Sequence, residues 1–135
     1  MADSGVKRIA ISGASGLIGT ALCGQLRNDG HTVLRFVRRE SKSTDEIRWD
    51  PKTGDVELSK LEGVDAVIHL AGAGVGDKRW TSKYRAEILN SRLLGTTAIA
   101  QAVATIKPDV FISASAIGWY GETGNRAVNE NDKPG

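Results

Sequence analysis

A run of glycines near the N-terminus, SGASGLIG at residues 12–19, constrains the fold more than any other stretch of this sequence. Each glycine costs conformational entropy on folding, so three of them at every third position must meet a structural need. The apolar, β-branched residues 6–12 precede the run and predict a buried strand. Residues 17–28 follow it and carry apolar side chains at helical spacing. A strand, a glycine turn and a helix in this order predict the first unit of a doubly wound α/β fold.

Each glycine has a distinct role in such a unit. Gly13 permits a sharp exit from the strand, Gly16 lets the backbone approach a pyrophosphate, and Gly19 lets the helix pack closely on the sheet. The helix N-terminus adds free N–H groups and the positive end of the helix dipole. The alternative is a strand–helix turn that binds nothing, but the context favours a dinucleotide. The predicted cofactor contacts in this loop are Gly13, Ser15, Gly16, Leu17, Ile18 and Gly19.

The remaining pattern alternates apolar strands with helices, which predicts a parallel sheet with right-handed crossovers. Further strands are predicted over residues 32–37, 46–49, 64–72 and 109–115, a local pairing over 56–58, and a long helix over 81–105. The fold class is therefore α/β, with a Rossmann-like, doubly wound parallel sheet of strand order 3-2-1-4-5. Its ligand crevice opens at the carboxyl ends of the first and fourth strands.

Several segments resemble known proteins. The G-x-x-G-x-x-G spacing resembles that of the short-chain dehydrogenase/reductase superfamily. HLAG at 69–72 resembles the second glycine motif of that superfamily, and FISASAIGWYG at 111–121 resembles the fifth-strand segment of its extended, sugar-nucleotide epimerase-like branch. Three segments resemble the atypical epimerase family that is also described as a cell-division-inhibitor family: RWDP at 48–51, ILNSRLLGTT at 88–97 and SASAIGWYG at 113–121. The resemblance runs from Lys7 to about Glu130 and implies an NAD(P)-binding Rossmann domain over residues 1–135, the N-terminal part of a longer enzyme.

The end of the second predicted strand favours NADP over NAD. NAD sites usually place an acid there to bind the ribose 2′-hydroxyl, whereas this chain has Val37 followed by Arg38 and Arg39. Guanidinium groups suit a 2′-phosphate, and Arg38 is the expected main contact. The alternative is a solvated basic loop, and Glu40 is the nearby acid that could support NAD instead.

The fourth strand and the long helix supply the opposite side of the crevice. Leu70, Ala71 and Gly72 are expected to line the cofactor, because small residues allow close approach of the backbone. The resemblance also implies that Glu87 and Arg92, on the long helix, face the ribose and the phosphates. An ordinary pair of surface charges is the alternative for these two residues.

The catalytic set is incomplete in this stretch. Redox members of the superfamily use Ser or Thr, Tyr and Lys, and the resemblance makes Ser115 and Tyr120 the catalytic candidates. Ala116, however, stands where the hydroxyl is expected, and no Tyr-x-x-x-Lys occurs. We therefore expect the NADP-binding domain of an epimerase-like or short-chain reductase-type oxidoreductase, for a nucleotide-sugar or other carbonyl substrate, that is inactive as this chain alone. The alternatives are a non-catalytic NADP(H)-binding sensor or interaction module and, less favoured, a domain for another nucleotide.

Composition and charge restrict the classes of partner that this chain can bind. The formal net charge is +2 with no long basic run, which argues against nucleic acid. One cysteine forms neither an internal disulfide nor a zinc site, so we expect no metal and a reducing, cytoplasmic location. No apolar run reaches the roughly 20 residues of a membrane span. The resemblance implies that the sheet of the longer enzyme has further strands beyond this stretch. Without them the last strand here should leave an exposed apolar sheet edge, which predicts self-association.

Overall fold

The computed structural model describes residues 5–135 as an α/β fold around a six-stranded sheet of order β4-β3-β2-β1-β5-β6. The strands are β1 Arg8–Ser12, β2 Thr32–Val37, β3 Glu46–Asp50, β4 Asp55–Val56, β5 Ala66–His69 and β6 Val110–Ser113. The helices are α1 Leu17–Asn28 and α2 Ser82–Ile106, with short 3-10 turns η1 Leu58–Leu61 and η2 Ile117–Tyr120. Counted along the chain, the parallel strands have the predicted order 3-2-1-4-5, and the two-residue β4 extends the sheet by pairing antiparallel with β3.

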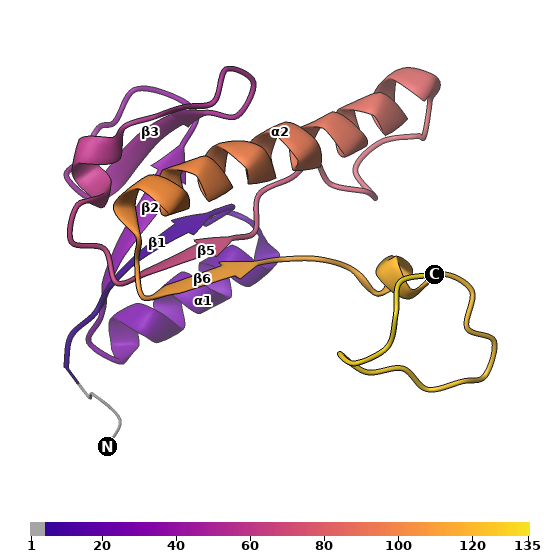
Figure 1. Cartoon of the computed structure of the whole chain (residues 1–135). Helices are drawn as coiled ribbons and strands as arrows, with labels where there is room; N and C mark the ends of the chain where they lie inside the picture. Colours follow the sequence, from indigo (N-terminus) through magenta and orange to yellow (C-terminus); the bar gives the residue numbers. More distant parts are fainter. Residues whose placement is uncertain (1–4) are drawn as a thin grey trace.

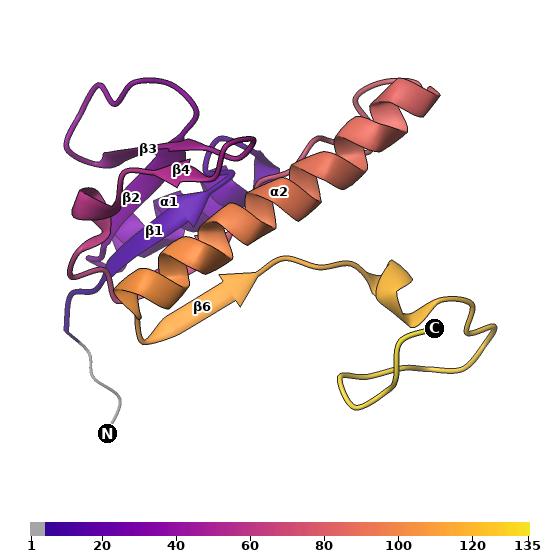
Figure 2. The ribbon, with the colours of Figure 1, turned by 45° about the horizontal axis from the view of Figure 1, so that its top comes forward.

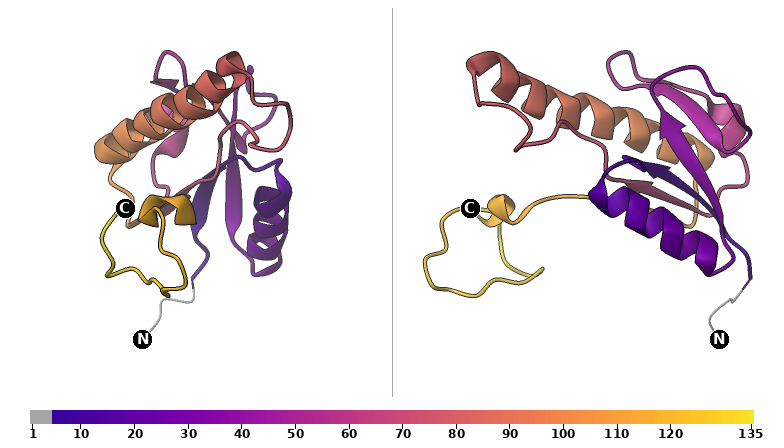
Figure 3. Two further views of the ribbon diagram at one scale, coloured as in Figure 1. Left: turned by 90° about the vertical axis from the view of Figure 1, so that its right-hand side faces the viewer. Right: turned by 180° about the vertical axis from the view of Figure 1, so that it is seen from behind.

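The two helices cover opposite faces of the sheet, with α2 on one side and α1 on the other (Figures 1 and 3). The larger apolar core lies between the sheet and α2 and includes Ile47, Trp49 and Ile99. The smaller core lies between the sheet and α1 and includes Ile11 and Cys23. Burial of one such aliphatic side chain stabilises the fold by roughly 1.5–3 kcal/mol, so these cores hold the sheet and both helices together.

Both helices begin and end where local signals predict. The predicted bounds of α1, residues 17–28, are confirmed, and Gly30 follows it with φ +90°. Thr81 caps α2 by accepting a hydrogen bond from the Tyr84 N–H at 3.1 Å, and Lys107 ends α2 in the left-handed conformation. Across residues 5–135, no helix has both the length and the apolar character that crossing a membrane requires.

The sheet edge at β6 is uncovered. Val110, Phe111 and Ile112 are exposed, and beyond Ser113 the chain runs away from the sheet before folding back on η2 (Figure 2). The 3-10 turn was not predicted, because a single turn held by a bond such as Gly121 N–H to Gly118 O has no sequence period. The expected apolar edge is therefore present, while self-association through it stays a prediction.

Candidate cofactor-binding site

The glycine loop lies at the carboxyl end of β1, and two of its glycines are demanded by the backbone itself. Gly13 has φ +70°, and a Cβ there would lie 2.9 Å from the backbone nitrogen of Ala71. A Cβ on Gly19 would lie 2.0 Å from the carbonyl oxygen of Gly13 and 2.8 Å from the Cα of Ala14. The loop therefore closes against β5 through Gly13, and α1 packs on the turn through Gly19.

Gly16 differs from its two neighbours in the motif. It is the N-terminal flanking residue of α1, in extended backbone, and a Cβ there would meet only the Gly13 carbonyl oxygen, at 3.4 Å. Within residues 5–135, no acceptor binds the backbone N–H groups of Leu17, Ile18 and Gly19, and the first turn of α1 holds no acid. Open space and unpaired N–H groups at a helix N-terminus fit the pyrophosphate of a dinucleotide.

A buried polar chain connects β1, β5 and α2 beneath this loop. The Ser12 Oγ accepts hydrogen bonds from the N–H groups of Leu70, at 3.0 Å, and Ala71, at 3.2 Å. Its own O–H is then left to donate to Nδ1 of His69, 2.6 Å away. His69 therefore carries its proton on Nε2 and donates to the Thr96 Oγ1 at 3.1 Å. Burial lowers the pKa of His69, which keeps the ring neutral.

The two cofactor contacts predicted on the long helix α2, Glu87 and Arg92, lie in different surroundings. The Arg92 guanidinium lies against Gly72, where a Cβ would be 3.3 Å from Arg92 Cζ, and donates to the carbonyl oxygens of Ala73 and Ile88. Glu87 is exposed on the first half of α2 and forms no hydrogen bond in the described part of the chain. The structure thus brings Arg92 to the segment after β5, but it does not bring Glu87 there.

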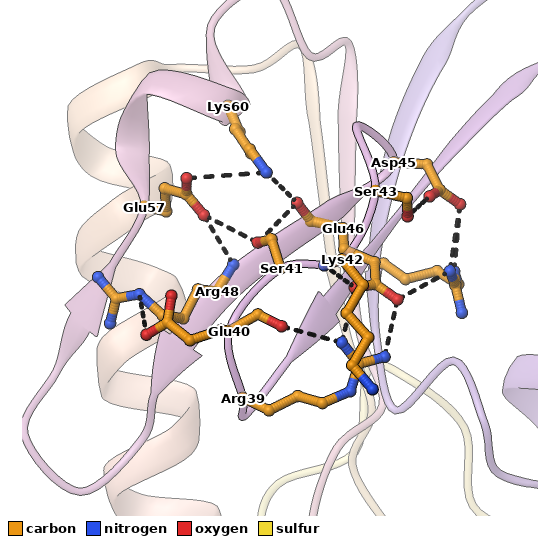
Figure 4. A network of polar contacts seen from close by, with 11 residues as sticks. Arg39, Glu40, Ser41, Lys42, Ser43, Asp45, Glu46, Arg48, Glu57 and Lys60 are labelled. Carbon is orange, nitrogen blue, oxygen red and sulfur yellow. Dashed lines mark hydrogen bonds and ion pairs between the residues drawn. The ribbon is translucent and has the colours of Figure 1, made fainter.

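The two arginines after β2, both predicted to contact the cofactor, have different partners in the structure. Arg38 is exposed and has no hydrogen-bond or ion-pair partner among residues 5–135. Arg39 binds the Glu46 carboxylate through both terminal nitrogens, at 2.7 and 2.8 Å (Figure 4). The Glu46 side chain is only 5% exposed, and a buried carboxylate needs such a cation. Arg39 therefore stabilises the loop, and of these two arginines only Arg38 has no partner among residues 5–135.

Glu46 organises the whole β2–β3 connection (Figure 4). Besides Arg39, its carboxylate accepts the Lys42 backbone N–H at 2.8 Å and an Arg35 nitrogen at 3.2 Å, and its carbonyl accepts Lys60 Nζ at 2.9 Å. The hydrogen bond from Arg39 and then that from the Lys42 backbone lower the pKa of Glu46 to about 2. These contacts fix the loop that presents Arg38.

The lowered pKa of Glu46 predicts a specific loss of stability in acid. Its folded-state pKa of about 2 lies below its ordinary value of 4.5, so its contribution is complete above pH 4.5 and disappears as the pH falls towards 2. Glu46→Gln should be less stable than the parent at pH 7, and the difference should shrink across that window. Urea denaturation of both proteins at several pH values measures it, and a difference independent of pH would contradict the assignment.

An open pocket of about 660 Å³ lies beside this loop, at the carboxyl ends of β2 and β3. Its lining contains more cations than acids: Arg38, Arg39, Glu40, Arg48, Trp49, Asp50, Pro51 and Lys52. The Asp50 carboxylate accepts the Lys52 backbone N–H at 2.9 Å and so caps the turn after β3. The pocket therefore presents an electropositive surface at the carboxyl ends of β2 and β3.

The catalytic candidates lie on the segment that follows β6, where the Ala114 N–H donates to the His69 carbonyl oxygen at 2.9 Å. Ser115 is exposed two residues beyond the end of β6. Tyr120 is in η2, where its ring packs edge-on against Trp119 with centroids 5.2 Å apart. The structure therefore leaves Ser115 and Tyr120 on the segment that departs from the sheet, and their catalytic roles stay predictions.

Comparison with known proteins identifies the family. Residues 9–134 match the sequence model of the NAD dependent epimerase/dehydratase family. The chain belongs to this family. It is similar to the Epimerase family protein ML0860 of Mycobacterium leprae, with 41% identity over 127 residues that cover 94% of this chain and 41% of that protein. The chain thus spans about two fifths of the length of this curated relative.

Solved structures of epimerase type share the fold. The nucleoside-diphosphate sugar epimerase from Corynebacterium glutamicum superposes with a TM-score of 0.80 at 35% identity, covering 98% of this chain and 28% of that one. MoeE5, solved with UDP-glucuronic acid and NAD, superposes with a TM-score of 0.74 at 30% identity, covering 94% of this chain and 42% of that one. The resemblance seen in the sequence is confirmed, and this chain is an NAD(P)-binding domain of epimerase type.

Proposed function

We propose that this chain is the NADP-binding part of an epimerase-like or short-chain-reductase-type oxidoreductase. The observation that carries the choice of NADP is Arg38, an exposed guanidinium directly after β2 that has no partner among residues 5–135, at the position where an NAD site usually has an acid. The competing choice is NAD, which MoeE5 binds and which Glu40 could serve here. Arg38 favours NADP because a guanidinium attracts a 2′-phosphate and gains little from a ribose hydroxyl.

The remaining site residues would bind and orient the cofactor. The N–H groups of Leu17 and Ile18 at the start of α1, which have no acceptor among residues 5–135, would bind the pyrophosphate. Ser12 and His69 hold the backbone of Leu70, which lines the crevice from the β5 side. When bound, a nicotinamide cofactor supplies hydride transfer. Arg92, beside Gly72, would contact the phosphates or the ribose from α2.

The substrate is proposed by class only. The similarity to MoeE5, which was solved with UDP-glucuronic acid, favours a nucleotide sugar, with another carbonyl compound as the broader class. In the whole protein, Ser115 and Tyr120 would transfer the proton to or from the substrate. This 135-residue chain by itself should turn nothing over, since Ala116 supplies no hydroxyl and no lysine follows a tyrosine at the usual spacing.

Removal of Arg38 tests the choice of cofactor. The parent chain should bind NADPH about ten- to a hundredfold more tightly than NADH, because one charge-assisted contact contributes roughly 1.5–3 kcal/mol. Arg38→Ala should remove most of that difference by weakening NADPH alone. Calorimetric titration with both cofactors measures it. Lys42→Ala is the matched control, because it removes an exposed cation of the same loop and keeps the backbone bond to Glu46.

Equal affinities of the parent for both cofactors, or a preference for NADH, would overturn the NADP assignment. Loss of the preference in Lys42→Ala as well would show that the general charge of the loop, and not Arg38, is responsible.

A second candidate is a sensor that binds NADP(H) without turnover. Ala116, at the position where a catalytic hydroxyl is expected, favours it. The two candidates separate in the longest natural form of the protein, mixed with NADPH and a panel of nucleotide sugars, aldehydes and ketones. Consumption of the reduced nicotinamide, followed by its absorbance, supports the enzyme; cofactor binding with no consumption supports the sensor.

A further inference from the structure

The basic pocket at the carboxyl ends of β2 and β3 holds one more guanidinium besides those of Arg38 and Arg39. Arg48 is the third residue of β3, and the parallel register pairs it with Val37, the residue before Arg38. Adjacent strands lie about 4.8 Å apart, so Arg38 and Arg48 extend from neighbouring positions at one edge of the sheet. Both residues line the pocket.

The contacts of Arg48 leave part of its guanidinium available. Its Nη1 donates to Asp55 on β4 at 2.6 Å, while its Nε lies 4.0 Å from the Glu40 carboxylate. The Arg48 side chain is 34% exposed and that of Glu40 is 94% exposed. The contact with Glu40 is thus long and solvated, which makes it weak and easy to replace.

A 2′-phosphate can bind more than one guanidinium. A phosphate monoester carries between one and two negative charges at neutral pH and has three acceptor oxygens, whereas Arg38 supplies one positive charge. Arg39 cannot add a second, because Glu46 engages both of its terminal nitrogens. Among the arginines that line the pocket, this leaves Arg48.

We propose that Arg48 is a second 2′-phosphate-binding residue beside Arg38, and that Glu40 competes with the phosphate for it. The inference rests on the nucleotide binding proposed above, but not on any catalytic activity. It makes Arg48 and Glu40 determinants of cofactor specificity: Arg48 favours the phosphorylated ribose, and Glu40 opposes it. Asp55 holds Arg48 at the pocket from the other side.

A purely structural role for Arg48 is the competing explanation. The Arg48–Asp55 pair joins β3 to β4 and could serve only to brace that hairpin. In that case Arg48→Gln and Asp55→Asn should both lower stability and leave nucleotide preference unchanged. The proposal instead requires that nucleotide preference depend on Arg48 and on Glu40.

The test uses two nucleotides that differ only in the 2′-phosphate, adenosine 2′,5′-bisphosphate and adenosine 5′-monophosphate. Calorimetry gives the ratio of their affinities for the 135-residue chain. Arg48→Gln should lower this ratio about tenfold while the affinity for the monophosphate stays the same. Arg48→Lys, which retains the charge, should lose less. Glu40→Gln should raise the ratio about two- to fivefold, because it removes a weak, exposed competitor.

Each outcome decides the proposal. An unchanged ratio in a folded Arg48→Gln protein overturns it, and if NADPH still binds tightly the proposed function stands. If Arg48→Gln does not fold, Glu40→Gln decides, and no rise in its ratio overturns the proposal. If neither nucleotide nor NADPH binds the parent chain, this inference and the proposed function both fail.

Discussion

Gly16→Val should abolish binding of both NADPH and NADH while the helix that follows it still forms. The backbone of Gly16 is extended, with φ −75° and ψ −178°, so valine can adopt it. Its Cβ would touch only the Gly13 carbonyl oxygen, at an ordinary 3.4 Å. The rest of the side chain would enter the open space beside the free N–H groups of Leu17 and Ile18. That space is where the pyrophosphate should lie.

The expected loss of affinity is on the order of a hundredfold or more, because a branched side chain excludes the phosphate and blocks several of its hydrogen bonds. The cost in folding stability should stay within about 1 kcal/mol, the difference between a fair and a poor helix-capping residue. Fluorescence titration with each cofactor measures binding, and circular dichroism reports whether α1 forms. A folded Gly16→Val protein with near-parental affinity would show that the glycine loop is only a turn.

Gly19→Ala should mainly lower the stability of the fold, whereas Gly16→Val mainly lowers cofactor affinity. The loss of stability should be large although only one methyl group is added. The added Cβ would lie 2.0 Å from the Gly13 carbonyl oxygen and 2.8 Å from the Cα of Ala14. Both obstacles are backbone atoms, so no side-chain rotation can relieve the clash. Separating α1 from the turn should cost about 3 kcal/mol or more, at the upper end of the usual cost of overpacking.

Gly24→Ala is the matched control, since it makes the same substitution in the same helix at a position where a Cβ would meet nothing within 4 Å. It should stabilise the chain by roughly 0.5–1 kcal/mol, because alanine is the better helix former. Urea denaturation of the two variants gives the comparison. Similar stabilities for Gly19→Ala and Gly24→Ala would contradict the tight packing of α1 on the glycine turn.

Local signals were sufficient to predict most of the architecture. The bounds of α1 follow from Gly16 before it and Gly30 after it, because helix start and stop signals act within a few residues. The order of the parallel strands follows from alternating strand and helix segments, because right-handed crossovers leave few topologies. The glycine spacing likewise predicted the turn between β1 and α1. All of these features depend on short-range conformational preferences that a single chain reveals.

The hydrogen-bond and ion-pair partners of the polar side chains depended on the tertiary structure. Arg38 and Arg39 are equivalent by their neighbours in sequence, yet only Arg39 is neutralised, because parallel pairing of β2 with β3 brings Glu46 beneath the loop. Ser12 and His69 are 57 positions apart in the sequence, so the hydrogen bond between them, which selects one tautomer of the His69 ring, could not be predicted from neighbouring residues.

The sequence by itself therefore determined the order of elements and the glycine turn between β1 and α1, because backbone conformation is encoded by nearby residues. Only the tertiary structure decided which charges remain free, because a carboxylate such as Glu46 finds its cation through burial and strand register. The position of the glycine loop could therefore be predicted from the sequence. The ion pair of Arg39 with Glu46 and the position of Arg48 beside Arg38 depend on the register of β2 and β3, which only the structure shows.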